Sequence, residues 1–255
     1  MARSPGRHNY EPSATLDVVT FDRAVLLTAA ARNNAAWCDT VCRSHGIVGT
    51  YGAGMWTSLV RTPRLYPDAV TLDPLVAAGD VLGAVDASPG CTIKDSFATL
   101  DLSPHGFEVL FEAMWIACAS MLTGADSTIT WARVTTLAQF ETWEDAWRGA
   151  DAEAAGILVP SLRSDTSVEI LTGIRRGVLV AGAILNRTDD VIGLSNVFTR
   201  DGDHPEVWPS LAAWVARSQP GRTVVGYESG ADLDAAIGAG FTPVGTLRVW
   251  SRPLP

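Results

Sequence analysis

The feature that most limits what this 255-residue chain can fold into is an internal repeat. In each half, a helix-like segment ends on a Pro-Gly pair and a strand-like segment follows, and later a Gly-Phe pair precedes a second strand. The offset stays between 131 (90 to 221) and 134 (106 to 240) residues. Such spacing indicates two related units, the first missing its early strands; chance similarity in Gly, Ala and Pro content is the alternative. The matching positions are Pro89-Gly90 and Pro220-Gly221, Ser96–Asp101 and Ser229–Asp234, and Gly106-Phe107 and Gly240-Phe241. The strand that follows carries Trp115 in the first half and Trp250 in the second.

Composition restricts the classes of function open to the chain. It is 47% hydrophobic and 18% charged, which is typical of a compact globular protein. A formal net charge of −9 disfavours binding to nucleic acid or to an anionic membrane. The sequence shows neither a long apolar run nor a signal-peptide pattern, so we expect a cytoplasmic protein. Lys94 is the only lysine, so lysine chemistry is limited to this position.

Periodicity and turn signals predict an α/β protein in which helices and strands alternate. Helices are expected at 21–45, 73–88, 137–150, 204–218 and 231–239. Strands are expected at 55–61, 68–72, 91–96, 106–119, 127–134, 167–175, 177–187, 191–199, 222–228 and 242–252, with a glycine-rich loop at 46–54. Residues 1–15 are polar and expected to be flexible. The segment 121–127 is the candidate boundary between an N-terminal unit, 16–126, and a C-terminal unit, 127–255.

The C-terminal unit resembles the GCN5-related N-acetyltransferase (GNAT) family. The stretch VLVAGAILNRTDDVIGLSNVFT (178–199) resembles that family's central antiparallel pair, and a helix, VVGYES, ADLDAAIGAGF and TPVGTLRVW follow in the family's order. The resemblance implies a mixed, mostly antiparallel sheet flanked by helices, in two tandem units if the first half is a truncated copy. It also implies that the strands 192–199 and 223–228 diverge and hold the pantetheine arm of acetyl-CoA or another acyl-CoA. The implied donor-binding residues are Ser195, Asn196, Val197, Phe198, Thr199 and Arg200.

The sequence departs from the family pattern where the CoA pyrophosphate would bind. The family uses a glycine-rich turn before a helix, whereas residues 200–207 read RDGDHPEV, with one glycine, three carboxylates and a proline. The family's helix-start Asn and its Tyr acid correspond here to about Ser229 and to Ala236. Three alternatives follow: acyl-CoA with an altered phosphate site, an acyl group carried on the phosphopantetheine of an acyl carrier protein, or loss of acyl transfer with a binding cleft retained.

Two neighbouring residues at the end of the strand 222–228 are candidates for acid–base chemistry. Glu228 would accept a proton from an attacking amine, and Tyr227 would protonate the leaving thiolate. The alternatives are that Glu228 caps the next helix and that Tyr227 packs with its hydroxyl satisfied. His204, at the start of the preceding helix, is a third candidate base, and a solvent-facing position is its alternative.

Two further clusters carry weaker signals. Arg61, Arg64 and Tyr66 lie in a basic, turn-rich stretch that would bind a substrate carboxylate or donor phosphate, or form a solvated loop. Cys38, Cys42 and His45 share one face of the first helix, but paired cysteines inside a helix are more typical of an apolar face than of zinc, so no metal is expected.

Together these patterns predict an N-acyltransferase that moves an acyl group from a pantetheine thioester to an amine of a small molecule. The expected partners are this amine substrate and, for the second alternative, an acyl carrier protein. The competing prediction is a non-catalytic GNAT-like binding or regulatory module.

Overall fold

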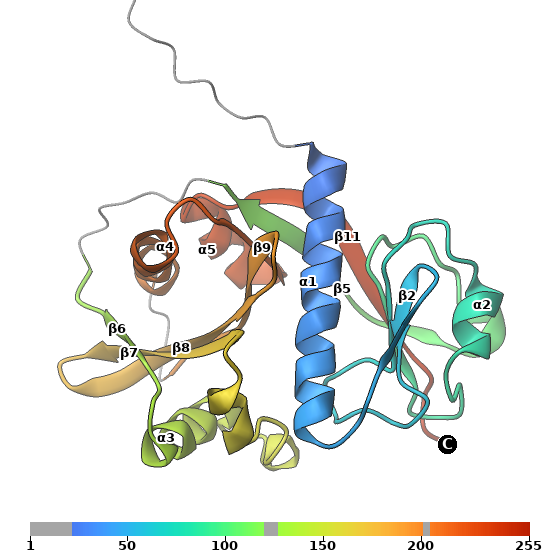
Figure 1. The fold of residues 1–255 in the computed structure, drawn as a ribbon, viewed down its shortest axis with the longest axis horizontal. Helices are drawn as coiled ribbons and strands as arrows, with labels where there is room; N and C mark the ends of the chain where they lie inside the picture. Colours follow the sequence, from blue (N-terminus) through green and yellow to red (C-terminus); the bar gives the residue numbers. More distant parts are fainter. Residues whose placement is uncertain (1–21, 120–126, 201–204) are drawn as a thin grey trace, which may run out of the picture.

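A computed structural model describes residues 22–119, 127–200 and 205–255, which form one large sheet flanked by helices (Figure 1). The helices are α1 (Arg23–Ser44), α2 (Ala78–Gly83), α3 (Leu137–Arg148), α4 (Val207–Ser218) and α5 (Gly230–Gly238), with 3-10 turns at Ser103–His105, Ala152–Ala154 and Pro160–Ser164. The strands are β1 (Thr50–Gly52), β2 (Met55–Thr57), β3 (Ala69–Thr71), β4 (Thr92–Asp95), β5 (Glu108–Cys118), β6 (Thr130–Arg133), β7 (Val168–Arg175), β8 (Val178–Arg187), β9 (Val191–Thr199), β10 (Thr223–Glu228) and β11 (Thr242–Ser251).

The sheet is built around a long antiparallel pair, β5 and β11, that comes from the two halves of the chain. The strand order is β1-β2-β3-β4-β11-β5-β10-β9-β8-β7-β6. On either side of the central pair an antiparallel neighbour comes first, then a parallel step (β4 to β3, β10 to β9), then antiparallel strands. The predicted α/β class with a mixed, mostly antiparallel sheet is therefore confirmed. One continuous sheet includes strands of both halves, and the proposed division into two units stays a prediction.

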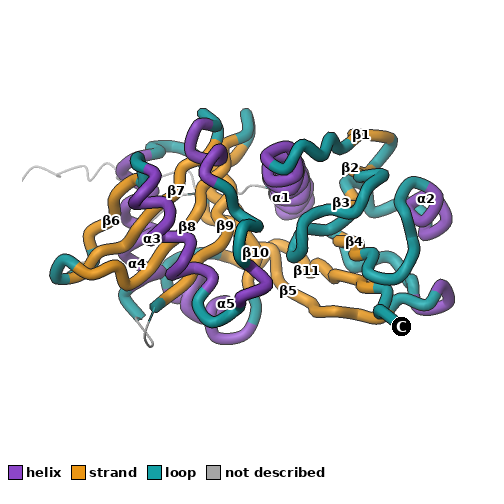
Figure 2. Tube along the Cα trace, turned by 90° about the horizontal axis from the view of Figure 1, so that it is seen from below, coloured by secondary structure: helices purple, strands orange, loops and turns teal. Residues whose placement is uncertain are grey.

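The helix α1 crosses one face of this sheet, over its middle strands (Figures 1 and 2). Its sequence is rich in alanine, a strong helix former, and Asp22 caps it by accepting a hydrogen bond from the Ala24 amide. Asn33 of α1 and Asn186 of β8 exchange hydrogen bonds directly above Gly193 of β9. A Cβ atom on Gly193 would lie 1.9 Å from Asn33 Oδ1, so this close approach requires glycine.

The opposite face of the sheet carries α4 and α5, and its core is apolar. Val207, Leu211 and Val215 of α4 pack with Phe241 and with the inward side chains of β5, β7, β8, β9 and β10. Burial of this many aliphatic side chains is the main stabilising contribution to such a layer. The two helical layers therefore fix β9 and β10 from both sides.

Most predicted elements are confirmed, and the differences have local causes. The helix expected at 73–88 forms only over Ala78–Gly83. Before it, Asp73 accepts a hydrogen bond from the Leu75 amide and makes a turn, and after it Asp86 does the same with the Ser88 amide. The loop expected at 46–54 contains the short strand β1. Residues 201–204 and 120–126 lie outside the described part of the chain, and the predicted boundary segment falls mostly there. Within the described residues, no helix is long and apolar enough to cross a membrane.

Candidate functional site

The strands β9 and β10 separate partway along their length. Their parallel pairing joins Thr223, Val224 and Val225 of β10 to Val191, Ile192 and Gly193 of β9, and it ends there. β9 continues for six residues, to Thr199, while it stays paired with β8 on its other side. Its free edge therefore faces a gap between the two strands, as the family resemblance implied.

A cavity of about 330 Å³ opens where the two strands diverge. This volume falls at the lower end of the range for small-molecule sites. Its walls come from α1, the loop before β3, the strands β4, β5, β9 and β10, and the end of α3. The lining residues are Asn34, Trp37, Cys38, Leu65, Tyr66, Pro67, Lys94, Phe111, Trp147, Leu194, Ser195, Asn196, Val197, Tyr227 and Glu228.

The wall formed by β9 is irregular at the predicted donor-binding residues. Asn196 has a left-handed backbone, with φ at 52°, and the pairing with β8 shifts register between Gly182 and Ile184. Such a bulge re-aims main-chain groups away from the ladder. Ser195 Oγ is buried and has no hydrogen-bond partner among the described residues. An unpartnered polar atom on a residue that lines a cavity is a candidate contact for a ligand.

The remaining predicted donor-binding residues lie along the same strand. Val197 lines the cavity, whereas Phe198 packs edge-on against Trp143 and Thr199 pairs with Ala181 of β8. The Arg200 amide donates to the Val180 carbonyl as the strand ends. Of this group, the residues Ser195–Val197 reach the cavity.

Glu228 lies at the wall formed by β10, in the position predicted for a base. Burial raises its pKa to about 8, and the nearby negative charge of Asp232 acts in the same direction. The N-cap of α5 is Ser229, and none of the described hydrogen bonds involves the Glu228 carboxyl group, which does not support the capping role. A carboxyl group with a pKa near 8 can accept and release a proton around neutral pH.

Tyr227 lies beside Glu228, and its hydroxyl has a charged neighbour. Lys94 Nζ donates to Tyr227 Oη at 3.2 Å and to Asn34 Oδ1 at 2.9 Å, and it lies 4.3 Å from the centre of the Tyr227 ring. The ring also packs edge-on against Trp115, with the ring centroids 5.4 Å apart. The Tyr227 hydroxyl oxygen accepts a hydrogen bond from Lys94, so the hydroxyl proton of Tyr227 can be donated to another group.

Tyr66 is the one predicted substrate-binding residue that reaches this cavity. It is buried, and burial raises its pKa well above 10, while a hydrogen bond to Asn196 ties it to the bulge of β9. Tyr66 is therefore neutral and links the loop before β3 to the site.

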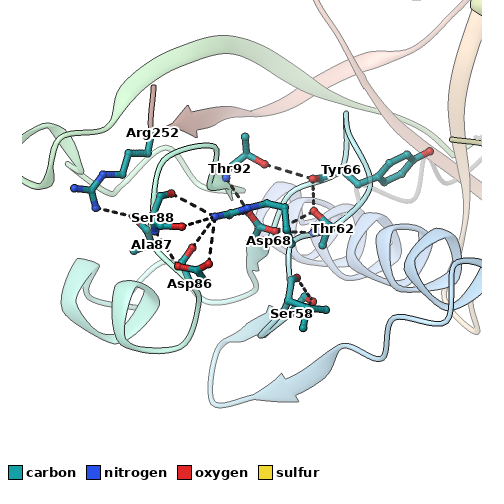
Figure 3. A network of polar contacts seen from close by, with 11 residues as sticks. Ser58, Thr62, Tyr66, Asp68, Asp86, Ala87, Ser88, Thr92 and Arg252 are labelled. Carbon is teal, nitrogen blue, oxygen red and sulfur yellow. Dashed lines mark hydrogen bonds and ion pairs between the residues drawn. The ribbon is translucent and has the colours of Figure 1, made fainter. Parts of the chain in front are cut away.

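Arg61 and Arg64 lie outside the cavity lining and are already paired. The Arg61 guanidinium contacts Asp68, and it also reaches Asp86 and Ser88 around the loop drawn in Figure 3. Asp68 in turn accepts from Thr62 and Thr92, so this network holds the loop in place. Arg64 pairs with Asp151 and Glu153 across the two halves of the chain. A substrate role for these two arginines stays a prediction.

The region predicted for the pyrophosphate is described only in part. His204 lies outside the described residues, with Asp201, Gly202 and Asp203. Glu206 precedes α4, where it accepts hydrogen bonds from Thr128 and pairs with Arg175, and these contacts lower its pKa. A carboxylate therefore lies near the helix start, where the resemblance would place an anion.

Cys38, Cys42 and His45, the three residues considered as zinc ligands, lie in environments that do not suit metal binding. Cys38 and Cys42 are buried free thiols, and burial raises the pKa of each. His45 Nε2 lies 2.7 Å from the Ile157 carbonyl. Among the described residues, no group of His, Cys, Asp and Glu side chains is arranged to hold a metal ion.

Lys94 and Asn34 are cavity residues to which sequence reasoning assigned no role. The repeat contained a signal for Lys94: Ser96 matches Ser229, so Lys94 corresponds to Tyr227, two residues earlier in each half. The structure places these two side chains in contact, although β4 and β10 are separated by β11 and β5 in the sheet. Asn34 had no comparable signal, because its role depends on how α1 crosses the sheet.

The β9 edge of the cavity fits the thioester end of the pantetheine arm that the resemblance implies. A pantetheine chain has two amides, which need main-chain or side-chain partners, and the free edge of β9 supplies main-chain groups of this kind. Ser195 Oγ adds a further unpartnered polar atom. The residues that would hold the arm are Leu194–Val197 on one side and Gly226–Glu228 on the other.

The fold is that of the GCN5-related N-acetyltransferases. A GCN5-related N-acetyltransferase from Kribbella flavida superposes with a TM-score of 0.61 and 16% identity, over 89% of this chain and 96% of that chain. One from Sphaerobacter thermophilus gives a TM-score of 0.51 and 12% identity, over 88% and 92% of the two chains. A GCN5-related N-acetyltransferase-like protein from Streptococcus suis also gives 0.51 and 12%, over 90% and 99%. No family model and no curated protein matches the sequence.

Proposed function

We propose that the protein is an N-acyltransferase that moves an acyl group from a pantetheine thioester to the amine of a small molecule. The observation that carries the proposal is the divergence of β9 and β10 after Gly193 and Val225, with Tyr227 and Glu228 facing the resulting cavity. Solved GNAT structures with the same fold agree with it, and the residues at the cavity carry the argument, since the fold alone does not define a reaction. The cytoplasm remains the expected setting.

In this reaction an amine nitrogen bonds to the thioester carbonyl carbon, and the carbon–sulfur bond breaks. The pantetheine group supplies the activated acyl carbon. Glu228 accepts the proton that the amine loses, and its pKa of about 8 suits exchange with an amine near neutral pH. Tyr227 donates a proton to the departing sulfur, after which solvent returns a proton to the phenol and removes one from Glu228.

The nature of the donor depends on what lies beyond the pantetheine arm. A free CoA carries a pyrophosphate, which in this fold would approach the start of α4, where Glu206 is neutralised by Arg175. An acyl carrier protein presents the same arm without the 3′-phospho-ADP group, so it avoids this carboxylate. The proposal therefore includes both donors, acyl-CoA and acylated carrier protein, and binding measurements distinguish between them.

Calorimetry with acetyl-CoA, CoA and an acetylated acyl carrier protein tests donor binding. We expect a dissociation constant in the micromolar range, typical of enzyme substrates, for at least one of them. Binding to the carrier protein alone would select the carrier-dependent reaction. The absence of binding to all three would contradict the proposal.

Binding without transfer would select the alternative, a GNAT-like binding module. Mass spectrometry of a mixed pool of small amines, incubated with the donor that binds, separates the two. An amide product supports the enzyme, whereas donor binding with no product from any amine supports the module. Ser195→Ala is a useful companion variant, because it removes the unpartnered hydroxyl and adds no atoms to the buried site.

A further inference from the structure

Lys94 carries a buried positive charge that the proposed reaction does not use. The residue is 4% exposed, lies on β4, and is the only lysine in the chain. Its ammonium group has three donors, and neutral oxygens of Asn34 and Tyr227 accept two of them. Among the described residues, no carboxylate lies within ion-pair distance of Lys94 Nζ. One donor and the whole charge are therefore left for a ligand.

The groups around Lys94 do not supply the missing negative charge. Burial raises the pKa of Cys38, so this thiol is neutral. Burial likewise keeps Tyr66 neutral, and it raises the pKa of Glu228 to about 8, so most of that carboxyl group is protonated at pH 7. A charge held away from water without a counter-ion is unfavourable, so an anionic ligand would bind there with an electrostatic gain.

The rest of the cavity limits the kind of anion. Its volume is about 330 Å³, which admits a small molecule. Trp37, Trp147, Phe111 and Leu65 give it an apolar and aromatic wall, whereas a phosphate group would need several donors and more than one positive charge. A single carboxylate matches a single ammonium and a neighbouring amide, with an apolar body lying against the rings.

We propose that Lys94 anchors a carboxylate of the acceptor, so that the amine substrates are amino acids with apolar or aromatic side chains rather than simple amines. This inference rests on the proposed acyl transfer, because it assigns the substrate of the same cavity. Lys94 comes from the N-terminal half and Glu228 from the C-terminal half, so each half would hold one end of the acceptor. Asn34 fixes the ammonium from α1.

Lysine labelled with ¹³C at Cε tests the contact directly, because wild-type protein then gives one lysine signal. The probes are L-phenylalanine and L-leucine, each compared with its own carboxamide, which keeps the amine and the side chain. We expect the acids to move the Lys94 signal and to bind at least about tenfold more tightly than the amides, the size of one lost charged hydrogen bond. Equal binding of acid and amide, or binding of the acids without a shift of the signal, would overturn the proposal.

Turnover by Lys94→Gln provides the second test. We expect KM for the amino acid to rise about tenfold or more while KM for its amide changes little. An equal loss of kcat with acid and amide would overturn the proposal and assign Lys94 to proton transfer by Tyr227. Lys94→Arg, which keeps the charge, should restore part of the preference. Thermal unfolding of both variants checks that they fold, and the wild-type titration does not depend on them.

The outcomes also separate this inference from the proposed function. If the acids move the Lys94 signal but no amine is acylated, the acyl-transfer proposal is contradicted, and with it the assignment of the acid as an acceptor. If amides are acylated as efficiently as the acids, the function holds and the carboxylate anchor is wrong.

Discussion

The ends of β4 and β10 occupy comparable places on either side of the central strands, yet they differ in what surrounds them. Each strand pairs in parallel with its outer neighbour, β4 with β3 and β10 with β9. Each also ends in an acidic residue followed by serine: Asp95-Ser96 and Glu228-Ser229. After β4 the chain forms a turn that is held by hydrogen bonds between side chains and main-chain amides. The Ser96 amide donates to Thr71 Oγ1, and the Asp95 carboxylate accepts from the Phe97 and Leu100 amides.

After β10 the corresponding space stays open. None of the described hydrogen bonds involves the carboxyl group of Glu228, which lines the same cavity as Ser195 and Tyr227. Burial raises the pKa of both carboxyl groups, so a shifted pKa does not distinguish them. The difference lies in the partners: main-chain amides engage Asp95 in holding a turn, and Glu228 remains available to a substrate. Access and free hydrogen-bonding capacity therefore separate a structural carboxylate from a candidate catalytic one.

The largest expected effect comes from Glu228→Gln. If Glu228 is the base, kcat should fall about 10²- to 10⁴-fold, because Gln cannot accept the amine proton, while donor affinity stays close to wild type. Steady-state kinetics and calorimetry measure the two quantities. Glu141→Gln, an exposed change on α3, is the matched control and should leave both unchanged. A Glu228→Gln enzyme with wild-type turnover would remove Glu228 from the mechanism.

Asp95→Ala should show the opposite pattern. It leaves the Phe97 and Leu100 amides without their acceptor, so we expect a loss of about 1–3 kcal/mol in the free energy of unfolding. Urea unfolding measures this loss, and kcat of the folded protein, assayed well below its melting temperature, should stay close to wild type. A large loss of kcat with unchanged stability would show that the two carboxylates are not distinguished in the way that we describe.

The pH dependence of stability offers a third comparison. Glu228 has a pKa of about 8 in the folded protein and 4.5 as the reference value, so the folded state binds its proton more tightly. The resulting stabilisation is complete below about pH 4.5 and is lost as the pH rises through 8. Glu228→Gln does not titrate, so at pH 9 it should be more stable than wild type by up to about 5 kcal/mol, which corresponds to a melting temperature up to roughly 10–20 °C higher. If wild type and Glu228→Gln have equal melting temperatures at pH 4 and again at pH 9, the raised pKa of Glu228 is contradicted.

The smallest expected effect comes from Asp232→Asn. Asp232 contributes to the raised pKa of Glu228 through its negative charge, so its removal should lower that pKa by about a few tenths of a pH unit, as for an exposed charge. The rising limb of the kcat/KM profile should move to lower pH by the same amount. Asp234→Asn, on the same helix, is the control. A shift to higher pH, or an equal shift in the control, would exclude this coupling.

The order of elements along β7–β11 could be predicted from the sequence, because alternating apolar residues and turn signals are local. The same holds for the divergence of β9 and β10, which the family resemblance implied. The pairing of β5 with β10 and β11 could not be predicted, because a strand's partner is set by contacts between distant parts of the chain. Placing β5 between β10 and β11 joins the two halves in one sheet.

The candidate site was predictable where its residues lie on β9 and β10, since Tyr227, Glu228 and Ser195–Val197 belong to the resembling segment. Lys94 and Asn34 were not assigned to it, because they reach the cavity from β4 and α1 through packing that no local pattern encodes. Arg61 and Arg64 looked available as a basic stretch. Arg61 pairs with Asp68, which is near in sequence, and with Asp86, whereas Arg64 pairs with Asp151, which is distant.

Transfer of an acyl group to an amine, followed as release of free thiol together with the mass of the amide, tests the central claim most directly. Acetyl-CoA and an acetylated acyl carrier protein serve as donors, and amino acids with apolar side chains serve as acceptors. We predict amide formation by wild-type protein with at least one donor, rising with pH through about 8, and its loss in Glu228→Gln. Folded wild-type protein that forms no amide from either donor, at any pH from 6 to about 9, would contradict the account.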